Sequence, residues 1–417
     1  MKRIILLVAG VMLSLTIYAQ NEKVDWNVDL DYLAKELSEK HYNFFTVKSK
    51  DDFLSGINAI KQDIKNLNDF QIALKTQQLI ASFGDAHTML NFFRLLDENR
   101  ILPIHVFWAS DGLFIVQTTQ ENKEILGSQL LSINQIPITT IIDSLSTLFT
   151  VDNRAIVKII IPMIISSVQI LEYFGFSDST QIELGLKTKT NQNQTYILKP
   201  SVINQNNKVS FEPDTQAFDI KNKDVYFTDF YFANEKIYYM LYNVCWSKEL
   251  ELKHRGEENA KTMPSFKVFE ENALNTLKHQ PVDKIIFDLR HNSGGSSPQG
   301  TAFVEKLAKF LEKNPNIKTY VVIGSATFSS AILNALDFKK LTTAVFVGEE
   351  TAGKPNHFGE VTSFRLPNSN LSINYSTKYF KNTDENVNTI TPDVKIEMSF
   401  SDFTKGVDPV FEWIKQQ

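Results

Sequence analysis

The chain of 417 residues has a formal net charge of −5 at pH 7, 43% hydrophobic residues and a single cysteine. A mildly acidic chain without a basic block argues against nucleic acid as a partner. One cysteine excludes an intramolecular disulfide and a cysteine metal cluster. The length exceeds what one hydrophobic core usually holds, so two or three structural units are expected.

The N-terminus has the pattern of a secretory signal peptide. Lys2 and Arg3 precede an apolar run over residues 4–17, and the small residue Ala19 ends the segment. This order predicts a signal peptide over residues 1–19 and export of the mature protein to the periplasm or the extracellular space. An uncleaved membrane anchor is the alternative. After cleavage, no stable membrane insertion is expected.

Residues 20–99 predict an N-terminal helical domain. Apolar residues recur at helical spacing, and serine and aspartate stand where a capping box would open a helix. The predicted helices cover residues 29–42, residues 49–67 with the capping box at 49–52, and residues 69–82.

Residues 100–200 predict a β-rich module in which short β-like runs bracket a helical part. Residues 127–138 are similar to the closing hairpin of a PDZ domain. The apolar run over residues 156–176 has the length of a membrane span. Lys158 and Pro162 interrupt it, so a buried or groove-lining helix is the better interpretation.

Residues 201–417 alternate between apolar strands, small-residue turns and helical segments. This alternation predicts an α/β domain with a parallel sheet covered on both faces. Three polar turns follow its strands, at residues 288–295, 324–330 and 348–354. Ligands of such sheets bind outside the carboxyl ends of the strands, so the site is expected at this edge.

Ser329 is the candidate nucleophile because it lies where a strand gives way to a helix. That position exposes a hydroxyl beside the positive end of the helix dipole. Helix capping is the alternative role for this serine and for Ser330. Gly294 and Gly295 end the neighbouring strand and allow close approach of backbone N–H groups. One of them could form an oxyanion hole with the N–H of Ser330.

A serine hydroxyl needs a base, because it is a weak nucleophile at its own pKa. His87 has the side chain best suited to neutral pH, with Asp85 or Glu385 as candidate orienting carboxylates. Lys354, in the glycine loop after the next strand, is the other candidate, since a desolvated lysine can act as a base.

Together these segments resemble the C-terminal processing peptidases, also called tail-specific proteases. That family includes the catalytic core of tricorn protease and the interphotoreceptor retinoid-binding proteins. Five segments carry the resemblance: residues 288–295 to the D-L-R-x-N-x-G-G motif, 327–331 to the nucleophile turn, 348–354 to the G-E-x-T-x-G-K loop, 84–88 to the G-D-G-H-T motif, and 391–393 to the late P-D.

The resemblance implies a crotonase-like or ClpP-like α/β core in residues 201–417, with the helical and PDZ-like parts forming the walls of a substrate groove. Ser329 stands in the place of the nucleophile. His87 matches the general base of tricorn-type members, whose tetrad also contains a glutamate, here Glu385. Lys354 matches the base of members that use a Ser–Lys dyad. No metal or organic cofactor is implied, and the partner is a peptide or protein substrate.

The chain departs from the family pattern at three positions. Ile332 stands where many members have a glutamate, and Phe358 stands where dyad members usually have a glutamine. These changes favour His87 over Lys354 as the base. Ala86 occupies the place of the second serine of the tetrad.

The resulting hypothesis is an exported serine peptidase that hydrolyses peptide bonds with a serine nucleophile and a backbone oxyanion hole. A binding protein without turnover on the same scaffold is the first alternative, because Ile332, Phe358 and 12% aromatic residues suit an apolar cleft. An esterase or other acyl transferase would use the same serine. The sequence leaves the natural substrate and the oligomeric state open.

Overall fold

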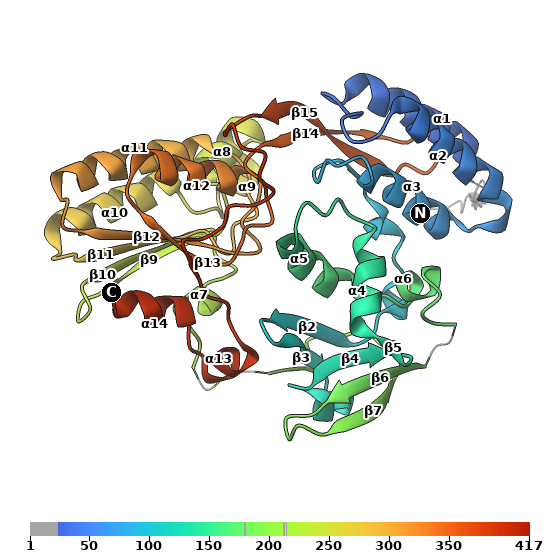
Figure 1. The fold of residues 1–417 in the computed structure, drawn as a ribbon, viewed down its shortest axis with the longest axis horizontal. Coiled ribbons are helices and arrows are strands. Elements are labelled where there is room, and N and C mark those ends of the chain that lie inside the picture. Colours follow the sequence, from blue (N-terminus) through green and yellow to red (C-terminus); the bar gives the residue numbers. More distant parts are fainter. Residues whose placement is uncertain (1–23, 179–180, 212, 214) are drawn as a thin grey trace, which may run out of the picture.

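The computed structural model describes residues 24–178, 181–211, 213 and 215–417, so the predicted signal peptide lies outside the described residues. Figure 1 shows a helical part (blue), a β-rich module (teal to green) and a larger α/β part (yellow to red). The predicted α/β class is confirmed, with several sheets and with helices on both faces of the six-stranded one.

The N-terminal part consists of three helices, as predicted. They are α1 (Trp26–Lys40), α2 (Lys50–Asp63) and α3 (Asp69–Ala81). The capping box that opens α2 is formed by Ser49 and Asp52, and it satisfies backbone groups that the first turn of a helix leaves free. The inner faces of the helices share one apolar core with the β-rich module.

The β-rich module is a seven-stranded antiparallel sheet with the main order β2-β3-β4-β6-β7. Its strands are β2 (Ile104–Ala109), β3 (Gly112–Thr119), β4 (Gln129–Ile133), β5 (Ile136–Pro137), β6 (Ile182–Lys187), β7 (Asn193–Leu198) and β8 (Lys208–Ser210). The intervening helices are α4 (Ile138–Ser146), α5 (Arg154–Ile164) and α6 (Val168–Tyr173).

The apolar run over residues 156–176 is divided between α5 and α6 instead of forming one long helix. Ile161 and Ile164 of α5 are fully buried in the protein core. Among the helices of the described residues, none has the length and apolar character to cross a membrane. The sequence predicted one buried or groove-lining helix here, and the structure instead has two shorter helices that both contribute to the apolar core.

The α/β part is built on a six-stranded sheet with the order β16-β13-β12-β11-β10-β9. All neighbouring pairs are parallel except the edge pair of β9 and β10. The strands are β9 (Phe227–Phe232), β10 (Ile237–Tyr242), β11 (Lys284–Asp288), β12 (Lys318–Ile323), β13 (Val345–Gly348) and β16 (Val394–Lys395).

Helices cover both faces of this sheet (Figure 1). One face packs against α10 (Phe266–His279), α11 (Pro298–Lys313) and α12 (Ser330–Leu341). The other face packs against α7 (Phe218–Lys221) and α14 (Pro409–Lys415). The shorter helices α8 (Lys248–His254), α9 (Glu257–Ala260) and α13 (Phe400–Lys405) lie in the connections.

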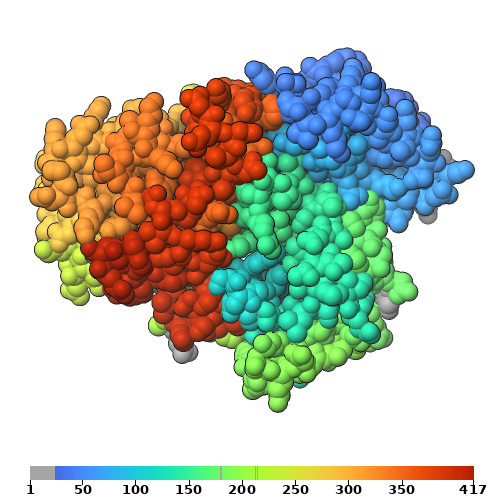
Figure 2. Space-filling view, viewed as in Figure 1, coloured from blue at the N-terminus to red at the C-terminus, as the bar shows by residue number. Residues whose placement is uncertain are grey.

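A hairpin of β14 (His357–Arg365) and β15 (Ser372–Phe380) leaves the six-stranded sheet and pairs with β1 (Met89–Leu90), which follows α3. Figure 2 shows the resulting contact between the N-terminal helices (blue) and the C-terminal region (orange to red). The hairpin therefore brings the loop at residues 84–88 to the carboxyl edge of the six-stranded sheet.

Candidate active site

Ser329 occupies a strained turn between β12 and α12. Its backbone has φ +52° and ψ −122°, a conformation that residues with a side chain rarely adopt. The side chain does not cap α12. Instead, Oγ lies 3.0 Å from Nε2 of His87. Such strain costs on the order of 1–3 kcal/mol and is concentrated at functional sites, so it supports the nucleophile interpretation over the capping one.

Hydrogen bonds to the neighbouring loops hold this turn in place. The hydroxyl of Thr327 donates to the carbonyl of Leu289 at 2.8 Å and accepts the N–H of Gly324 at 3.0 Å. The N–H of Gly353 donates to the carbonyl of Thr327 at 3.1 Å. The strained position of Ser329 is thus fixed from both sides by the loops that follow β11 and β13.

The glycine pair after β11 lies against the nucleophile turn. A Cβ on Gly294 would lie 2.8 Å from Cβ of Ser329, so only glycine allows this approach. The N–H of Gly294 donates to Oδ1 of Asn292 at 2.9 Å. This bond leaves the N–H groups of Gly295 and Ser330 as the candidate oxyanion donors. The hydroxyl of Ser330 donates to the carbonyl of Gly295 at 2.9 Å and links the two.

His87 is held with its ring against Ser329. The backbone N–H of His87 donates to Oδ1 of Asp85 at 2.9 Å, and the imidazole ring stacks on the ring of Phe328 at a centroid distance of 4.7 Å. Burial lowers the pKa of His87 to about 4, against the opposing effect of the Asp85 charge. The imidazole is therefore neutral at pH 7 and able to accept a proton.

Asp85 is the carboxylate that the structure places beside His87, with Oδ1 at 3.8 Å from Nδ1 of the ring. Its Oδ2 is hydrogen-bonded to His41, Ser376 and Thr88. Burial raises the pKa of Asp85, but these hydrogen bonds outweigh burial and hold the pKa at about 2. The carboxylate is charged across the physiological range.

His41 supports Asp85 from the end of α1. Its Nδ1 accepts the N–H of Asn43 at 3.0 Å, so the ring proton lies on Nε2, which is 3.0 Å from Oδ2 of Asp85. The sequence contains no local signal for this role, because His41 and Asp85 are 44 residues apart. His357, whose ring lies 5.9 Å from that of His87, was missed for the same reason.

Lys354 lines the cavity that contains Ser329 and His87. Its ammonium lies 2.6 Å from Oδ1 of Asp152, the residue just before the cap of α5. An ammonium paired with a carboxylate has no lone pair to accept the serine proton. Burial raises the pKa of Asp152, and the charge of Lys354 opposes that shift. The structure thus brings Lys354 to the site in an ion pair.

Glu385 is exposed, and it is absent from the residues that line the Ser329 cavity. Its backbone carbonyl accepts hydrogen bonds from Asn356 and Thr383. Among the described residues, the carboxylate next to His87 is that of Asp85. The expectation that Glu385 orients the histidine is therefore not supported, because Glu385 is exposed and lies outside this cavity.

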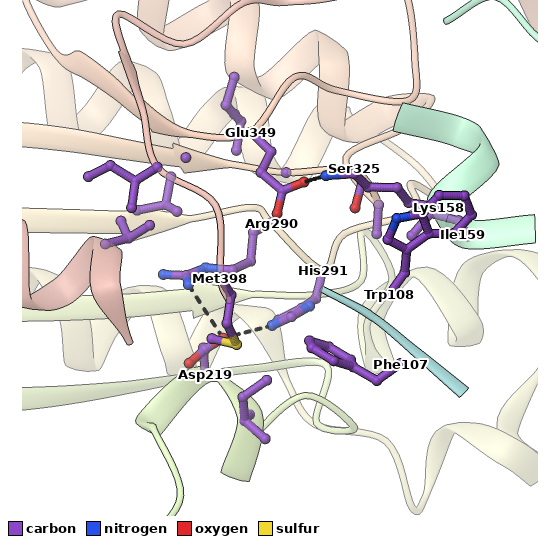
Figure 3. Close-up of a pocket in the computed structure, with 18 of the residues that line it drawn as sticks. Phe107, Trp108, Lys158, Ile159, Asp219, Arg290, His291, Ser325, Glu349 and Met398 are labelled. Atoms are coloured by element: carbon purple, nitrogen blue, oxygen red, sulfur yellow. Dashed lines mark hydrogen bonds and ion pairs between the residues drawn. The ribbon is translucent and has the colours of Figure 1, made fainter. Parts of the chain in front are cut away.

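A larger cavity of about 310 Å³ lies on the other side of the nucleophile turn, between the β-rich module and the sheet (Figure 3). Phe107, Trp108 and Lys158 line it from the module, and Arg290 and His291 line it from the loop after β11. Met398 and Asp219 also line it (Figure 3). Ser329 and His87 are not among its lining residues.

Comparison with known proteins identifies the α/β part. The model of peptidase family S41 matches residues 262–396, a region that contains Ser329, Ser330, both glycines and Lys354. Residues 262–396 are thus similar to the domain of that family, and the comparisons support a serine peptidase. The resemblance to the C-terminal processing peptidases is confirmed.

Solved structures of similar fold extend the comparison to nearly the whole chain. Mature CPAF complexed with lactacystin is 14% identical and has a TM-score of 0.63, with 94% of this chain and 97% of that chain covered. Mature CPAF is 13% identical, with a TM-score of 0.60 and 94% and 96% covered. At these identities the likeness concerns the fold alone. None of the curated proteins matches the sequence.

Proposed function

We propose that this protein is exported and cleaves peptide bonds with Ser329 as nucleophile and His87 as general base. The observation that carries the proposal is the contact of 3.0 Å between Oγ and Nε2. It joins a strained, uncapped serine to a neutral imidazole. The site roles rest on this geometry, and export rests on the signal-peptide pattern of the sequence.

In the first step, Nε2 of His87 accepts the proton of Ser329 while Oγ attacks the scissile carbonyl. The oxyanion that forms is bound by the N–H groups of Gly295 and Ser330, next to the N-terminus of α12. His87 then donates its proton to the leaving amine. In the second half, a water molecule deprotonated by His87 hydrolyses the acyl-enzyme.

Asp85 stabilises the imidazolium that exists between these proton transfers. Its distance of 3.8 Å from Nδ1 is longer than a hydrogen bond, and catalytic contacts are often long before substrate binds. As His87 gains a proton, attraction to the Asp85 carboxylate shortens this contact and stabilises the charged ring.

Lys354 has a different role in this mechanism. Its ion pair with Asp152 fastens the loop after β13 to the segment that precedes α5. Asn153, which caps α5, adds hydrogen bonds from Nδ2 to the carbonyls of Thr351 and Ala352. Lys354 therefore positions a wall of the site, and His87 transfers the proton.

Cleavage of an unbiased peptide mixture, read by mass spectrometry, tests the proposal. Labelling with a fluorophosphonate probe reports in parallel on the reactivity of Ser329. We expect both signals to be lost in Ser329→Ala and His87→Ala, and cleavage to persist in Lys354→Ala. Glu385→Gln is the control, because its side chain lies outside the cavity. Loss with Lys354→Ala and retention with His87→Ala would reverse the assignment of the base.

A further inference from the structure

A cavity of about 250 Å³ adjoins the one that contains Ser329 and His87. The two cavities share Gly84, Lys354 and Phe358 as lining residues. The complete lining of the second cavity is Tyr42, Asn43, Thr46, Val47, Gly84, Lys354, Asn356, Phe358, Tyr379 and Asn386. A group bound there would therefore contact residues that also line the cavity of Ser329.

Three aromatic side chains from three separate elements form the apolar wall of this cavity. Tyr42 follows α1, Phe358 belongs to β14 and Tyr379 belongs to β15. The ring of Phe358 lies 4.9 Å from that of Tyr379 and 6.4 Å from that of Tyr42. Tyr42 is 60% exposed and Tyr379 is 37% exposed. Apolar ring surface is thus left uncovered beside the catalytic serine, where a ligand could bury it.

Two polar side chains of the lining, those of Lys354 and Asn356, are engaged within the protein. Lys354 is the one charged residue of the lining, and Asp152 neutralises it at 2.6 Å. Asn356 uses Oδ1 to accept the N–H groups of Asn382 and Thr383 and uses Nδ2 to donate to the carbonyl of Thr383. A charged substrate side chain would have no unpaired opposite charge to bind in the lining. The lining therefore favours an uncharged side chain, and its three rings favour an apolar one.

We infer that this cavity binds a large apolar or aromatic side chain of the substrate, directly before or after the scissile bond. The inference rests on the proposed peptidase mechanism, which places the scissile carbonyl at Ser329. An extended chain advances about 3.3–3.6 Å per residue, so a residue close to the cleaved bond can reach a cavity that shares walls with the one containing Ser329. The three rings offer edge-to-face and offset contacts to an aromatic guest.

The wall of the cavity and the catalytic carboxylate are supported by the same segment of chain. Tyr42 directly follows His41, whose ring is hydrogen-bonded to Asp85. The N–H of Tyr42 donates to the carbonyl of Ser376 at 2.9 Å, and the backbone is thereby fixed independently of the phenol ring. Replacing Tyr42 by alanine therefore removes part of the cavity wall, while the hydrogen bond between His41 and Asp85 is retained.

The test is a set of matched peptides that differ only in one residue flanking the cleaved bond: Phe, Ala or Lys, placed before the bond in one series and after it in the other. We expect wild type to prefer Phe in one of the two series. Tyr42→Ala and Tyr379→Ala should lower the Phe-to-Ala ratio of kcat/KM by about tenfold or more, since hydrophobic subsites discriminate by roughly 10–200-fold per methylene.

Thr46→Trp provides a second variant, because Thr46 is an exposed residue of the lining and a larger side chain there fills the cavity. It should move the preference from Phe towards Ala. The matched control is Phe230→Ala on β9, a residue that is 51% exposed at the far edge of the six-stranded sheet. Its Phe-to-Ala ratio should equal that of wild type.

The outcomes separate this inference from the mechanism on which it rests. Equal cleavage of the Phe, Ala and Lys peptides, or a Phe preference that survives all three cavity variants, overturns the inference. Labelling of Ser329 by a fluorophosphonate would then still support the serine chemistry. Absence of both labelling and cleavage in folded wild type overturns the mechanism and the inference together.

Discussion

Two polar clusters lie at the carboxyl edge of the same sheet, and they differ in how their groups are paired. In the cluster around Arg290, the guanidinium donates to Asp288 at 2.8 Å, to both oxygens of Asp408 at 3.0 and 2.8 Å, and to the hydroxyl of Tyr239 at 3.2 Å. Each of the three guanidinium nitrogens of Arg290 therefore has a hydrogen-bond partner. Since Asp408 caps α14, this cluster fastens the C-terminal helix to the sheet.

The polar groups of the cluster around Ser329 have fewer close hydrogen-bond partners. Its serine has a strained backbone, its imidazole is neutral, and Nδ1 of His87 remains 3.8 Å from Asp85. A fully satisfied buried network is rigid, whereas a proton-transfer site needs groups whose charge can change. In the structural cluster the guanidinium is fully paired, although Oδ1 of Asp219 beside it has no hydrogen-bond partner among the described residues, whereas in the candidate catalytic cluster Nδ1 of the histidine has its carboxylate at 3.8 Å.

Ser329→Ala should give the largest effect on activity. We expect peptide cleavage to fall by roughly 10⁵-fold or more, as removal of a nucleophile does in serine peptidases. The unfolding midpoint should hardly change, because the side chain of Ser329 contributes no cap to α12. Cleavage assays and thermal unfolding check both parts. Retention of cleavage would remove the basis for treating this cluster as catalytic.

Asp85→Asn should lower kcat/KM by about 10³-fold, somewhat less than loss of the triad aspartate in proteases where it bonds directly to histidine. The charge of Asp85 raises the pKa of His87, so its removal should also move the acid limb of the pH profile to lower pH. Kinetics over a pH series measures both effects. A lower rate without a shifted limb would indicate a structural role alone.

Arg290→Met should act on stability instead of chemistry. It leaves Asp288 and Asp408 buried without their cation, and breaking a buried pair typically costs about 3–5 kcal/mol. Urea unfolding measures this loss. Lys306→Met is the control, because the exposed pair of Lys306 with Glu270 should contribute only about 0–1 kcal/mol. Equal effects of the two variants would contradict the structural role of the Arg290 cluster.

The pH dependence of kcat/KM should reflect the lowered pKa of His87, which is about 4. The base must be neutral to accept the serine proton. Activity should therefore be constant from about pH 5 to neutrality and fall tenfold per pH unit below about pH 4. Wild-type rates in buffers checked for folded protein measure the limb. A limb near the ordinary histidine pKa of about 6.5 would contradict the buried, neutral state.

Lys354→Met should give the smallest catalytic effect, a decrease of about tenfold or less, because it loosens a wall of the site without removing the base. Glu385→Gln should match wild type. Parallel kcat and KM measurements check these expectations. A decrease comparable to that of Ser329→Ala would show that Lys354 is the base.

Local sequence patterns predicted the elements and the candidate nucleophile. The capping box of Ser49, the strand and helix that flank Ser329, and the paired glycines at 294 and 295 are all recognisable within a few residues. Their structures follow from hydrogen bonding, steric limits and side-chain periodicity, which act between near neighbours in the chain. Polar residues within the apolar run at 156–176 likewise indicated that it would not span a membrane.

Tertiary structure alone decided which polar groups meet. Ser329 and His87 are 242 residues apart, and only the hairpin of β14 and β15 brings their segments together. The choice of Asp85 over Glu385 beside the histidine, and the pairing of Lys354 with Asp152, depend on which carboxylates the folded chain places within reach. Burial and partner identity set the charge states of such groups, and neither quantity is contained in a local stretch of sequence.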